Sequence, residues 1–355
     1  MRIVGALDVH RSQITFRWQD METGEVRRGQ IVPAAREPMR EWLAGFEPGD
    51  AHFVLEGTTG WRFVTEEIER AGFSPHLAEP AETSRSRGPK RRAKTDRADC
   101  DHMSKLLMED RLPESWIPPE QILELRTRVR LRKTLIEQRT EWQQRMHAQL
   151  FHQGVPPGLK LWSRAGRARL DETQLSPAGR RLIETGVRML DYLDNEITPL
   201  DRELASFARR QPGCRALRGK LYGIGFMTAA AIVAELGDAR RFKSSDDAVR
   251  YAGLDVTVHE SNSKRAPGHL SRQGPAVLRW ALFEAAQCAA RKSSPDYGYY
   301  LKVRERIDHP RACLSVARKL ARRAHHILRE LGDEAIAPVS GPAPVPTRLR
   351  VRAAA

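Results

Sequence analysis

The chain begins with MRIVGALDVH (residues 1–10), an apolar run that ends near the carboxylate of Asp8. A second run of the same kind, AHFVLEG (residues 51–57), ends at Glu56. Short apolar runs bounded by turn residues predict buried strands. Each strand would place one carboxylate at the edge of a sheet, where an unpaired charge is costly. Because a divalent cation such as Mg²⁺ is commonly held by carboxylates and phosphate oxygens, the pattern indicates phosphoryl-transfer chemistry on DNA or RNA.

Two more carboxylates, Asp96 and Asp99, fall three residues apart where a helix is expected to begin. Taken alone they are explained by capping, because Thr95 is a good N-cap and acidic residues in a first turn complement the helix dipole. Asp8 and Glu56 also have a simpler interpretation, as residues that begin turns. The order along the chain favours a shared role: strand carboxylate, hairpin, strand carboxylate, then two carboxylates on one helix face. This order predicts a ribonuclease-H-like nuclease core.

Residues 1–110 alternate between predicted strands and helices, which indicates an α/β domain. Strands are expected at 3–9, 13–19, 25–32, 52–56 and 74–77, and helices near 37–46, 61–71 and 96–108. Between the last strand and the last helix lies SRSRGPKRRAK (residues 84–94), which has no apolar periodicity. Such a run is either a solvated segment or a clamp for a nucleic-acid backbone beside the carboxylates. We expect the clamp, made by Arg87, Lys90, Arg91, Arg92 and Lys94.

A second region, residues 111–210, follows a boundary marked by three prolines and is predicted to be two long helices, 120–153 and 176–210. In the second helix apolar residues recur at spacings of three and four, as in a coiled coil or helical hairpin. They are Leu190, Leu193, Ile197, Leu200, Leu204 and Phe207. An intramolecular helix pair and a dimer seam explain this pattern equally well. Thr198 followed by Pro199 predicts a kink or a restart of the helix.

The third region, residues 211–335, is predicted to be mainly helical, with helices at 226–236, 275–291 and 311–331. Gly223 and Gly225 precede the first of these helices and would let backbone N–H groups approach a phosphate, as in a helix-hairpin-helix element. A tight turn explains the two glycines about as well. Residues 336–355 are expected to form a flexible tail rich in Pro, Ala and Arg.

Basic side chains of this third region are assigned to phosphate contacts. Arg318, Arg322 and Arg329 stripe one face of the helix at 311–331, for which the alternative is a solvated face. Lys264 and Arg265, in the polar loop 259–270, are given the same role.

The overall charge agrees with a nucleic-acid partner. The formal net charge is +15 and the isoelectric point is about 10.1. Residues 1–110 carry 17 basic against 19 acidic side chains, whereas residues 211–355 carry 25 against 13. Most phosphate contacts are therefore expected outside the acidic core, where the carboxylates would repel DNA.

The cysteines and the hydropathy of the chain indicate in which cellular compartment the protein is expected. The four cysteines form no close pair typical of a metal site or a disulfide framework, so reduced thiols are expected. No apolar run approaches the roughly 18 residues of a membrane span. The sequence therefore predicts a cytoplasmic protein associated with the nucleoid.

Eight short motifs occur in a fixed order along nearly the whole chain: GALDV (5–9), VLEGTTG (54–60), AKTDRAD (93–99), GIG (223–225), AELGD (234–238), RF (241–242), YAGL (251–254) and HLSRQG (269–274). Together they resemble the transposases of the insertion-sequence-110 family. The resemblance implies a RuvC-like domain whose metal-binding tetrad is Asp8, Glu56, Asp96 and Asp99, with Mg²⁺ as the expected cofactor. It also implies a second, C-terminal transposase domain, a structured bridge RNA as a partner beside donor and target DNA, and a dimer or tetramer.

The same resemblance implies a catalytic serine eight residues after the glycine of the Ala-Gly-Leu motif, which is Ser261 in this chain, with Ser263 as the alternative. Without the resemblance a serine in this loop would be assigned to local hydrogen bonding. A serine hydroxyl is a weak nucleophile unless a base or a metal activates it.

We therefore expect a site-specific DNA recombinase that moves a mobile element through a serine transiently linked to DNA phosphate. One alternative is a metal-dependent junction-resolving endonuclease that uses water, and another is a non-catalytic nucleic-acid-binding protein, against which the intact tetrad argues. A tyrosine recombinase is suggested by Tyr297, Tyr299 and Tyr300, but it would leave the four carboxylates unexplained.

Overall fold

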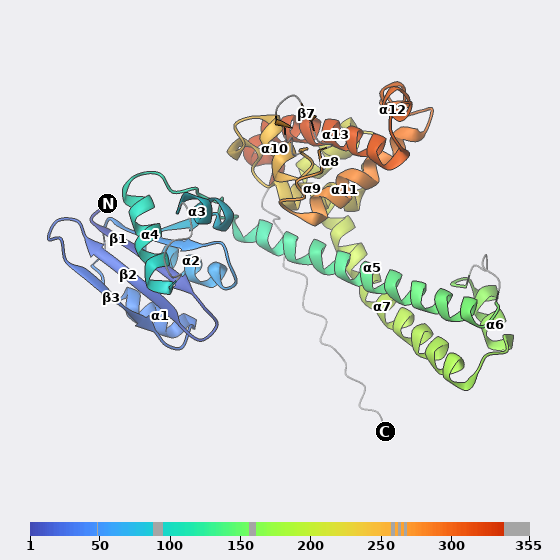
Figure 1. Ribbon diagram of the computed structural model, residues 1–355, viewed down its shortest axis with the longest axis horizontal. Helices are drawn as coiled ribbons and strands as arrows, with labels where there is room; N and C mark the ends of the chain where they lie inside the picture. Colours follow the sequence, from blue (N-terminus) through green and yellow to red (C-terminus); the bar gives the residue numbers. More distant parts are fainter. Residues whose placement is uncertain are drawn as a thin grey trace. The chain divides into compact units, whose positions relative to one another are not determined.

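The structure is a computed structural model that describes residues 1–47, 49–87, 95–155, 161–256, 260–261, 264–265 and 268–336. At positions 164, 260, 261, 264 and 265 it describes the backbone alone. The chain divides into two compact units, Met1–Ile117 and Pro118–Ala355, and each is described by itself (Figure 1). The finer division expected at residue 210 stays a prediction.

The first unit is built on a five-stranded mixed sheet. Its strands are β1 (Ile3–Val9), β2 (Ile14–Asp20), β3 (Val26–Ile31), β4 (Ala51–Glu56) and β5 (Ser74–Ala78). Their order is β3-β2-β1-β4-β5, with β1, β2 and β3 antiparallel and β1, β4 and β5 parallel. This topology agrees with the ribonuclease-H-like fold that the sequence predicts. Because Leu7 pairs with Leu55, Asp8 and Glu56 end neighbouring parallel strands at the same level.

Helices cover both faces of this sheet. On one face α1 (Arg36–Leu43) and α2 (Trp61–Arg70) bury a core that includes Phe53 and Ile68. On the other face α4 (Asp96–Met108) packs Cys100 and Met103 against the alternate side chains of β1 and β4. Alternate side chains of β1 thus enter two different cores, one on each face of the sheet. A shift of the strand by one residue would exchange them, so this pattern fixes the register and the position of Asp8.

One element of this unit corrects the sequence prediction. Residues 84–86, expected in a basic loop, form the end of a helix, α3 (Pro80–Ser86). The Glu79 side chain accepts a hydrogen bond from the backbone N–H of Glu82 at 2.6 Å, and Pro80 occupies the first turn. This N-terminal arrangement is favourable for a helix. The prediction missed the helix because the basic residues from 85 onward were interpreted as a loop.

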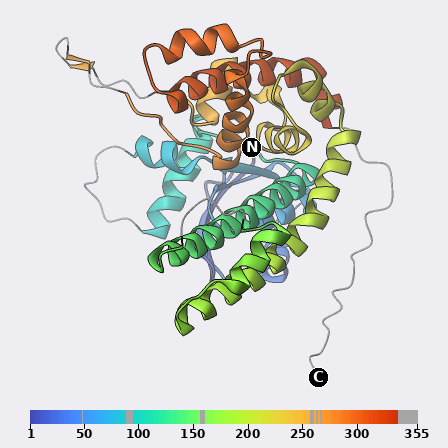
Figure 2. The same cartoon turned by 90° about the vertical axis from the view of Figure 1, so that its right-hand side faces the viewer.

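Two long antiparallel helices dominate the start of the second unit. α5 (Glu120–His152) and α7 (Pro177–Arg210) run side by side in both views (Figures 1 and 2), and the shorter α6 (Arg164–Glu172) lies between them in sequence. Ion pairs join the two long helices, with Arg139 Nη1 2.9 Å from Asp194 and Arg128 Nε 3.3 Å from Glu203. All the predicted seam residues except Phe207 are buried in α7, and Leu190, Leu200 and Leu204 share apolar clusters with side chains of α5. The intramolecular alternative is therefore confirmed.

Of the kink or restart expected at Thr198 and Pro199, the restart is wrong, and the kink stays a prediction. α7 continues through Pro199, and the Thr198 hydroxyl donates to the Asp194 carbonyl at 2.7 Å instead of capping a new helix. The continuous apolar face against α5 holds the helix together across the proline, which overrides the local signal.

The rest of this unit is a helical bundle around α9 (Phe226–Leu236), an Ala-rich and almost wholly buried helix. Small side chains allow neighbouring helices to approach it closely. It packs against α8 (Pro212–Lys220), α11 (Ala276–Gln287) and α13 (His309–Leu331), as well as against α5 and α7. Two further helices, α10 (Ser245–Tyr251) and α12 (Tyr297–Arg304), pack against α13. The remaining short elements are η1 (Ala239–Arg241), β6 (Glu260–Ser261), β7 (Lys264–Arg265), η2 (Cys288–Ala290) and η3 (Gly332–Ile336).

The four cysteines are unpaired. Burial raises the pKa of the Cys100 and Cys214 thiols to about 12. Among the described helices, none combines the length and the hydropathy needed to cross a membrane.

Candidate active site

Local structure brings the predicted carboxylates to one edge of the sheet. Asp8 lies near the end of β1 and Glu56 ends β4, while Asp96 and Asp99 occupy the first turn of α4. The Thr95 hydroxyl caps that helix by accepting from the backbone N–H of Ala98 at 3.2 Å. Capping therefore operates, and it fixes the direction in which the two helical carboxylates project.

Asp8, His10 and Asp96 form a compact cluster whose ligand atoms all lie within 4.8 Å of one another. His10 Nε2 is 3.3 Å from Asp8 Oδ2 and 3.6 Å from Asp96 Oδ1. Burial raises the pKa of Asp8, the charges of Asp96 and Asp99 raise it further, and His10 lowers it. The cluster thus concentrates negative charge in a partly buried place where a cation is favoured.

Arg87 connects the other two carboxylates. Its guanidinium pairs with Asp99 and lies 3.9 Å from Glu56 Oε1. Asp99 is buried, so this pairing offsets the cost of removing its charge from water. The sequence predicted Arg87 as a contact to nucleic acid, and the structure places it among the carboxylates.

The donor set suits a divalent metal. Carboxylate oxygens are the ligands that hard cations such as Mg²⁺ prefer, and an imidazole nitrogen is also accepted by Mn²⁺ and other transition metals. All four tetrad residues are present in unit 1, and Asp8 and Asp96 already lie at ligand spacing.

Sequence reasoning did not assign His10 to the site. His10 lies just beyond the end of β1 at Val9, and no pattern in the sequence singled it out.

The candidate serine lies in the second unit. Ser261 belongs to the short strand β6 and its backbone pairs with Lys264 of β7. The side chains of Ser261, Lys264 and Arg265 are outside the described atoms, and Ser263, Lys90, Arg91, Arg92 and Lys94 are outside the described residues. Their roles stay predictions.

Of the two glycines before α9, Gly223 is required by turn geometry and packing. It has a φ of +84°, and a Cβ there would lie 2.5 Å from the Ala285 carbonyl oxygen of α11. Gly225 has ordinary space around it, and its backbone N–H donates to the Thr228 hydroxyl at 2.8 Å. The tight-turn interpretation therefore accounts for Gly223, and phosphate binding by the two glycines stays a prediction.

The arginine stripe on α13 has intramolecular partners. Arg318 Nε donates to the Leu254 carbonyl at 2.6 Å, Arg322 pairs with Asp246 at 2.7 Å, and Arg329 Nη1 donates to the Phe242 carbonyl at 2.9 Å. These contacts attach α13 to the segment around α10, which is neither of the two roles considered from the sequence. Phosphate binding by Arg318 and Arg322 stays a prediction.

Comparison with known proteins agrees with this geometry. Residues 5–153 match a family model of DEDD proteins described as a transposase, and residues 217–301 match the model of the transposase IS116/IS110/IS902 family. A putative transposase of Sinorhizobium fredii, y4qE, is 28% identical over 270 residues, which is 74% of this chain and 65% of the relative. The transposase for insertion sequence element IS1111A of Coxiella burnetii is 28% identical over 151 residues, 41% of each chain.

A third relative, the transposase for insertion sequence element IS1328 of Yersinia enterocolitica, is 28% identical over 160 residues, 44% of this chain and 47% of the relative. The matched part of this chain thus spans between 41% and 65% of the relatives' lengths.

Proposed function

The chain belongs to the IS116/IS110/IS902 family of transposases, and from that premise we propose that it cuts and joins DNA to move an insertion sequence. The observation that carries this proposal is the cluster of Asp8, His10 and Asp96 at one edge of the sheet in unit 1. Glu56 and Asp99 are outside this cluster, and Arg87 contacts both of them. Acidic side chains at such an edge repel one another and DNA, and a bound divalent cation would offset this repulsion.

Asp8, Glu56, Asp96 and Asp99 would hold a divalent cation, which we propose to be Mg²⁺. A bound divalent ion supplies charge stabilisation for a phosphoryl group in transfer. His10 orients Asp8 and Asp96 through its contacts with both. Arg87 holds Glu56 and Asp99 in one place and limits their mutual repulsion.

We propose that Ser261 is the nucleophile. Its hydroxyl oxygen forms a bond to the scissile phosphorus, the bond from phosphorus to one strand's oxygen breaks, and the departing strand takes up a proton. The phosphoserine ester keeps the phosphodiester energy, so a strand hydroxyl can later displace the serine without a high-energy cofactor. The family resemblance and the match of residues 217–301 support this assignment.

By the same resemblance we propose a structured bridge RNA and a dimer or tetramer as the working assembly. The net charge of +15 supports binding to more than one nucleic-acid segment. A junction-resolving endonuclease that uses water is the second candidate, and one observation favours it: the four carboxylates are complete within unit 1 alone.

The metal claim is tested with a plasmid that carries the insertion sequence and its flanks. We expect Asp8→Asn, Glu56→Gln, Asp96→Asn and Asp99→Asn each to lower strand cleavage at least about a hundredfold while DNA binding is kept, because the carboxylates hold the cation and not the DNA. Chelator should have the same effect on the unaltered protein. Asp110→Asn, an exposed position just after α4, is the matched control. Normal cleavage by Asp8→Asn, or in excess chelator, would refute the metal site.

A further inference from the structure

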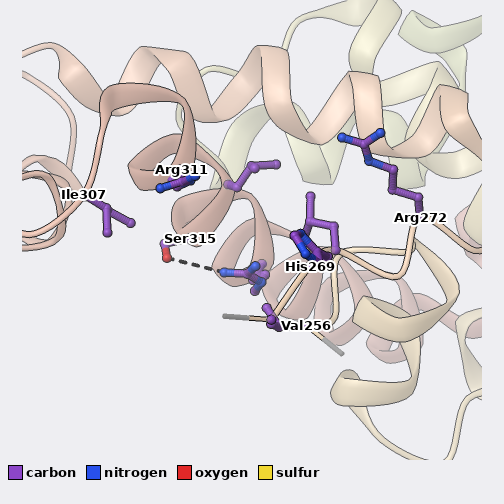
Figure 3. Close-up of a pocket in the computed structure, with 10 residues that line it drawn as sticks. Val256, His269, Arg272, Ile307, Arg311 and Ser315 are labelled. Carbon is purple, nitrogen blue, oxygen red and sulfur yellow. Dashed lines mark hydrogen bonds between the residues drawn. The ribbon is translucent and has the colours of Figure 1, made fainter. Parts of the chain in front are cut away.

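A cavity of about 690 Å³ lies in the second unit between α13 and the stem of the segment that carries Ser261 (Figure 3). Val256 and Leu270 form an antiparallel bridge that closes this stem, and both line the cavity. Ile307 and Leu314 complete an apolar wall. The volume falls in the range of about 300–1,000 Å³ that is typical of sites for small ligands.

The polar part of the lining is basic. Arg272, Arg311 and Arg318 all contribute to it, and none of the described residues that line the cavity is acidic. In Figure 3 Arg311 and Ser315 project from the α13 side, with Val256 and His269 on the opposite side. An apolar wall beside several guanidinium groups matches a ligand that is part ring or sugar and part anion.

Arg318 is the most constrained of the three arginines. Its Nε donates to the Leu254 carbonyl, which fixes the plane of the guanidinium, and its Nη1 lies 3.4 Å from the Ser315 hydroxyl. Burial lowers the pKa of Arg318. Asp255 also acts on Arg318, but it does not line the cavity. Within the cavity an anionic ligand would stabilise this half-buried cation.

Arg311 is held only loosely. It pairs with Asp308 at 3.6 Å, and both side chains are largely exposed. An exposed pair of this kind contributes about 0–1 kcal/mol, so the arginine can turn to a ligand at little cost.

We propose that this cavity binds one nucleotide of the DNA strand that the protein cuts, with its phosphate at Arg311 and Arg318 and its sugar or base against the apolar wall. The proposal rests on the proposed function, because DNA is identified by the position of the cavity at the stem of the segment that carries Ser261. In this proposal the described residues of the stem hold the DNA strand beside Ser261, the candidate nucleophile.

The test measures binding of a short fluorescein-labelled single-stranded DNA, and of RNA of the same sequence, to the full chain at several salt concentrations. Arg311→Gln should weaken DNA binding several-fold and lower the slope of log affinity against log salt by about 0.7, the value for one lost phosphate contact on a single strand. Arg304→Gln removes an exposed arginine of α12 outside the cavity and should leave the slope unchanged.

A second pair of variants separates the cavity from surface charge. Ser315→Tyr fills the cavity and keeps every charge, so it should weaken DNA binding about as much as Arg311→Gln. Ser315→Ala removes the same hydroxyl but leaves the cavity open, and should bind nearly normally. Thermal unfolding of all four variants shows that each one folds.

DNA binding by Arg311→Gln and Ser315→Tyr equal to that of their controls would overturn the proposal, as would an equal loss of RNA and DNA binding. The binding test needs no cleavage, and the same losses should appear when Asp8→Asn is combined with each variant. Failure of the proposed function is recognised separately, by cleavage that survives in Asp8→Asn.

Discussion

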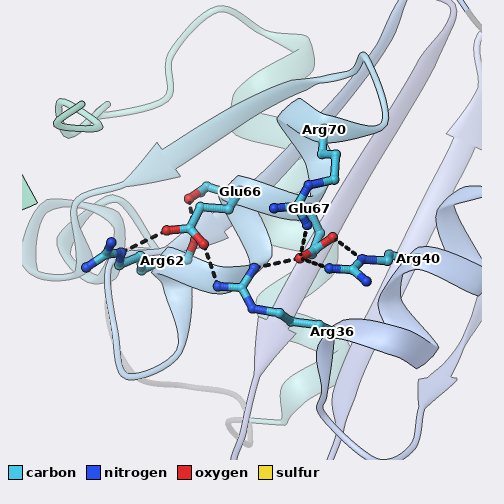
Figure 4. Close-up of polar contacts among 7 residues, drawn as sticks. Arg36, Arg40, Arg62, Glu66, Glu67 and Arg70 are labelled. Carbon is cyan, nitrogen blue, oxygen red and sulfur yellow. Dashed lines mark hydrogen bonds and ion pairs between the residues drawn. The ribbon is translucent and has the colours of Figure 1, made fainter. Parts of the chain in front are cut away.

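Glu67 on α2 shows how single residues stabilise the first unit away from the candidate site. Its carboxylate is fully buried and accepts hydrogen bonds from Arg36 at 2.5 Å, Arg40 at 2.6 Å and Arg70 at 2.5 Å (Figure 4). These hydrogen bonds, with Arg40 the largest contributor, lower the pKa of Glu67 to about 2 despite its burial. A carboxyl group with a depressed pKa stabilises the fold above its unfolded pKa of about 4.5 and loses that contribution as the pH falls toward 2.

Glu67→Gln should therefore lower the free energy of unfolding at neutral pH by about 2 kcal/mol, because three half-exposed arginines lose their shared anion. The deficit should shrink as the pH falls from about 4.5 to 2, since the unaltered protein then loses the same interaction. Urea unfolding of the full chain at several pH values measures this difference. Glu69→Gln, an exposed change on the same helix, is the control. A deficit that is constant over this pH range would mean that Glu67 acts through packing alone.

At the candidate site, the sequence indicated a residue where a carboxylate stands at the end of an apolar run. Asp8 and Glu56 follow from two apolar runs, and register brings their strand ends together. His10 was not predicted as a site residue, and Arg87 was predicted as a contact to nucleic acid and not as a partner of the carboxylates. Their contacts depend on how the chain leaves β1 and on the end of α3, which no periodicity in the sequence specifies.

At the scale of elements, boundaries were predictable where one face is buried. The predicted bounds of β1, α4 and α9 agree with the structure, and each of these elements has a consistent buried face or core. α3 is short and polar, and its local signals are limited to the N-cap Glu79 and to Pro80 in the first turn, so it was missed. At Pro199 the local signal was strong, but packing against α5 prevailed.

Pro199 lies on the exposed side of α7 and lacks the N–H that would bond to the Asn195 carbonyl. Pro199→Ala should raise the free energy of unfolding by about 1–3 kcal/mol, because it restores this hydrogen bond and removes a steric clash without loss of packing. Chemical unfolding monitored by circular dichroism measures the change. Thr198→Ala, which keeps the proline, should give no gain. A destabilised Pro199→Ala would show that α7 needs the proline for its contact with α5.

At the scale of the whole molecule, acidic and basic residues are unevenly distributed along the chain. In the proposed function, the acidic residues of the first unit carry the chemistry, and the excess of basic residues at 211–355 attracts the phosphates of DNA. The cavity beside α13 would, as proposed above, add a specific contact to this general attraction. The composition predicted the partner class, but it could not locate the cavity, because its walls come from segments that only the fold brings together.

The central claim is that DNA becomes linked to Ser261 during the reaction. The direct measurement is to denature the reaction before completion and to map any protein–DNA adduct by mass spectrometry. We predict an adduct on the peptide that contains Ser261, which Ser261→Ala abolishes together with strand exchange while DNA binding is kept. Free DNA ends with full activity of Ser261→Ala, or an adduct on Tyr297, Tyr299 or Tyr300, would contradict the account.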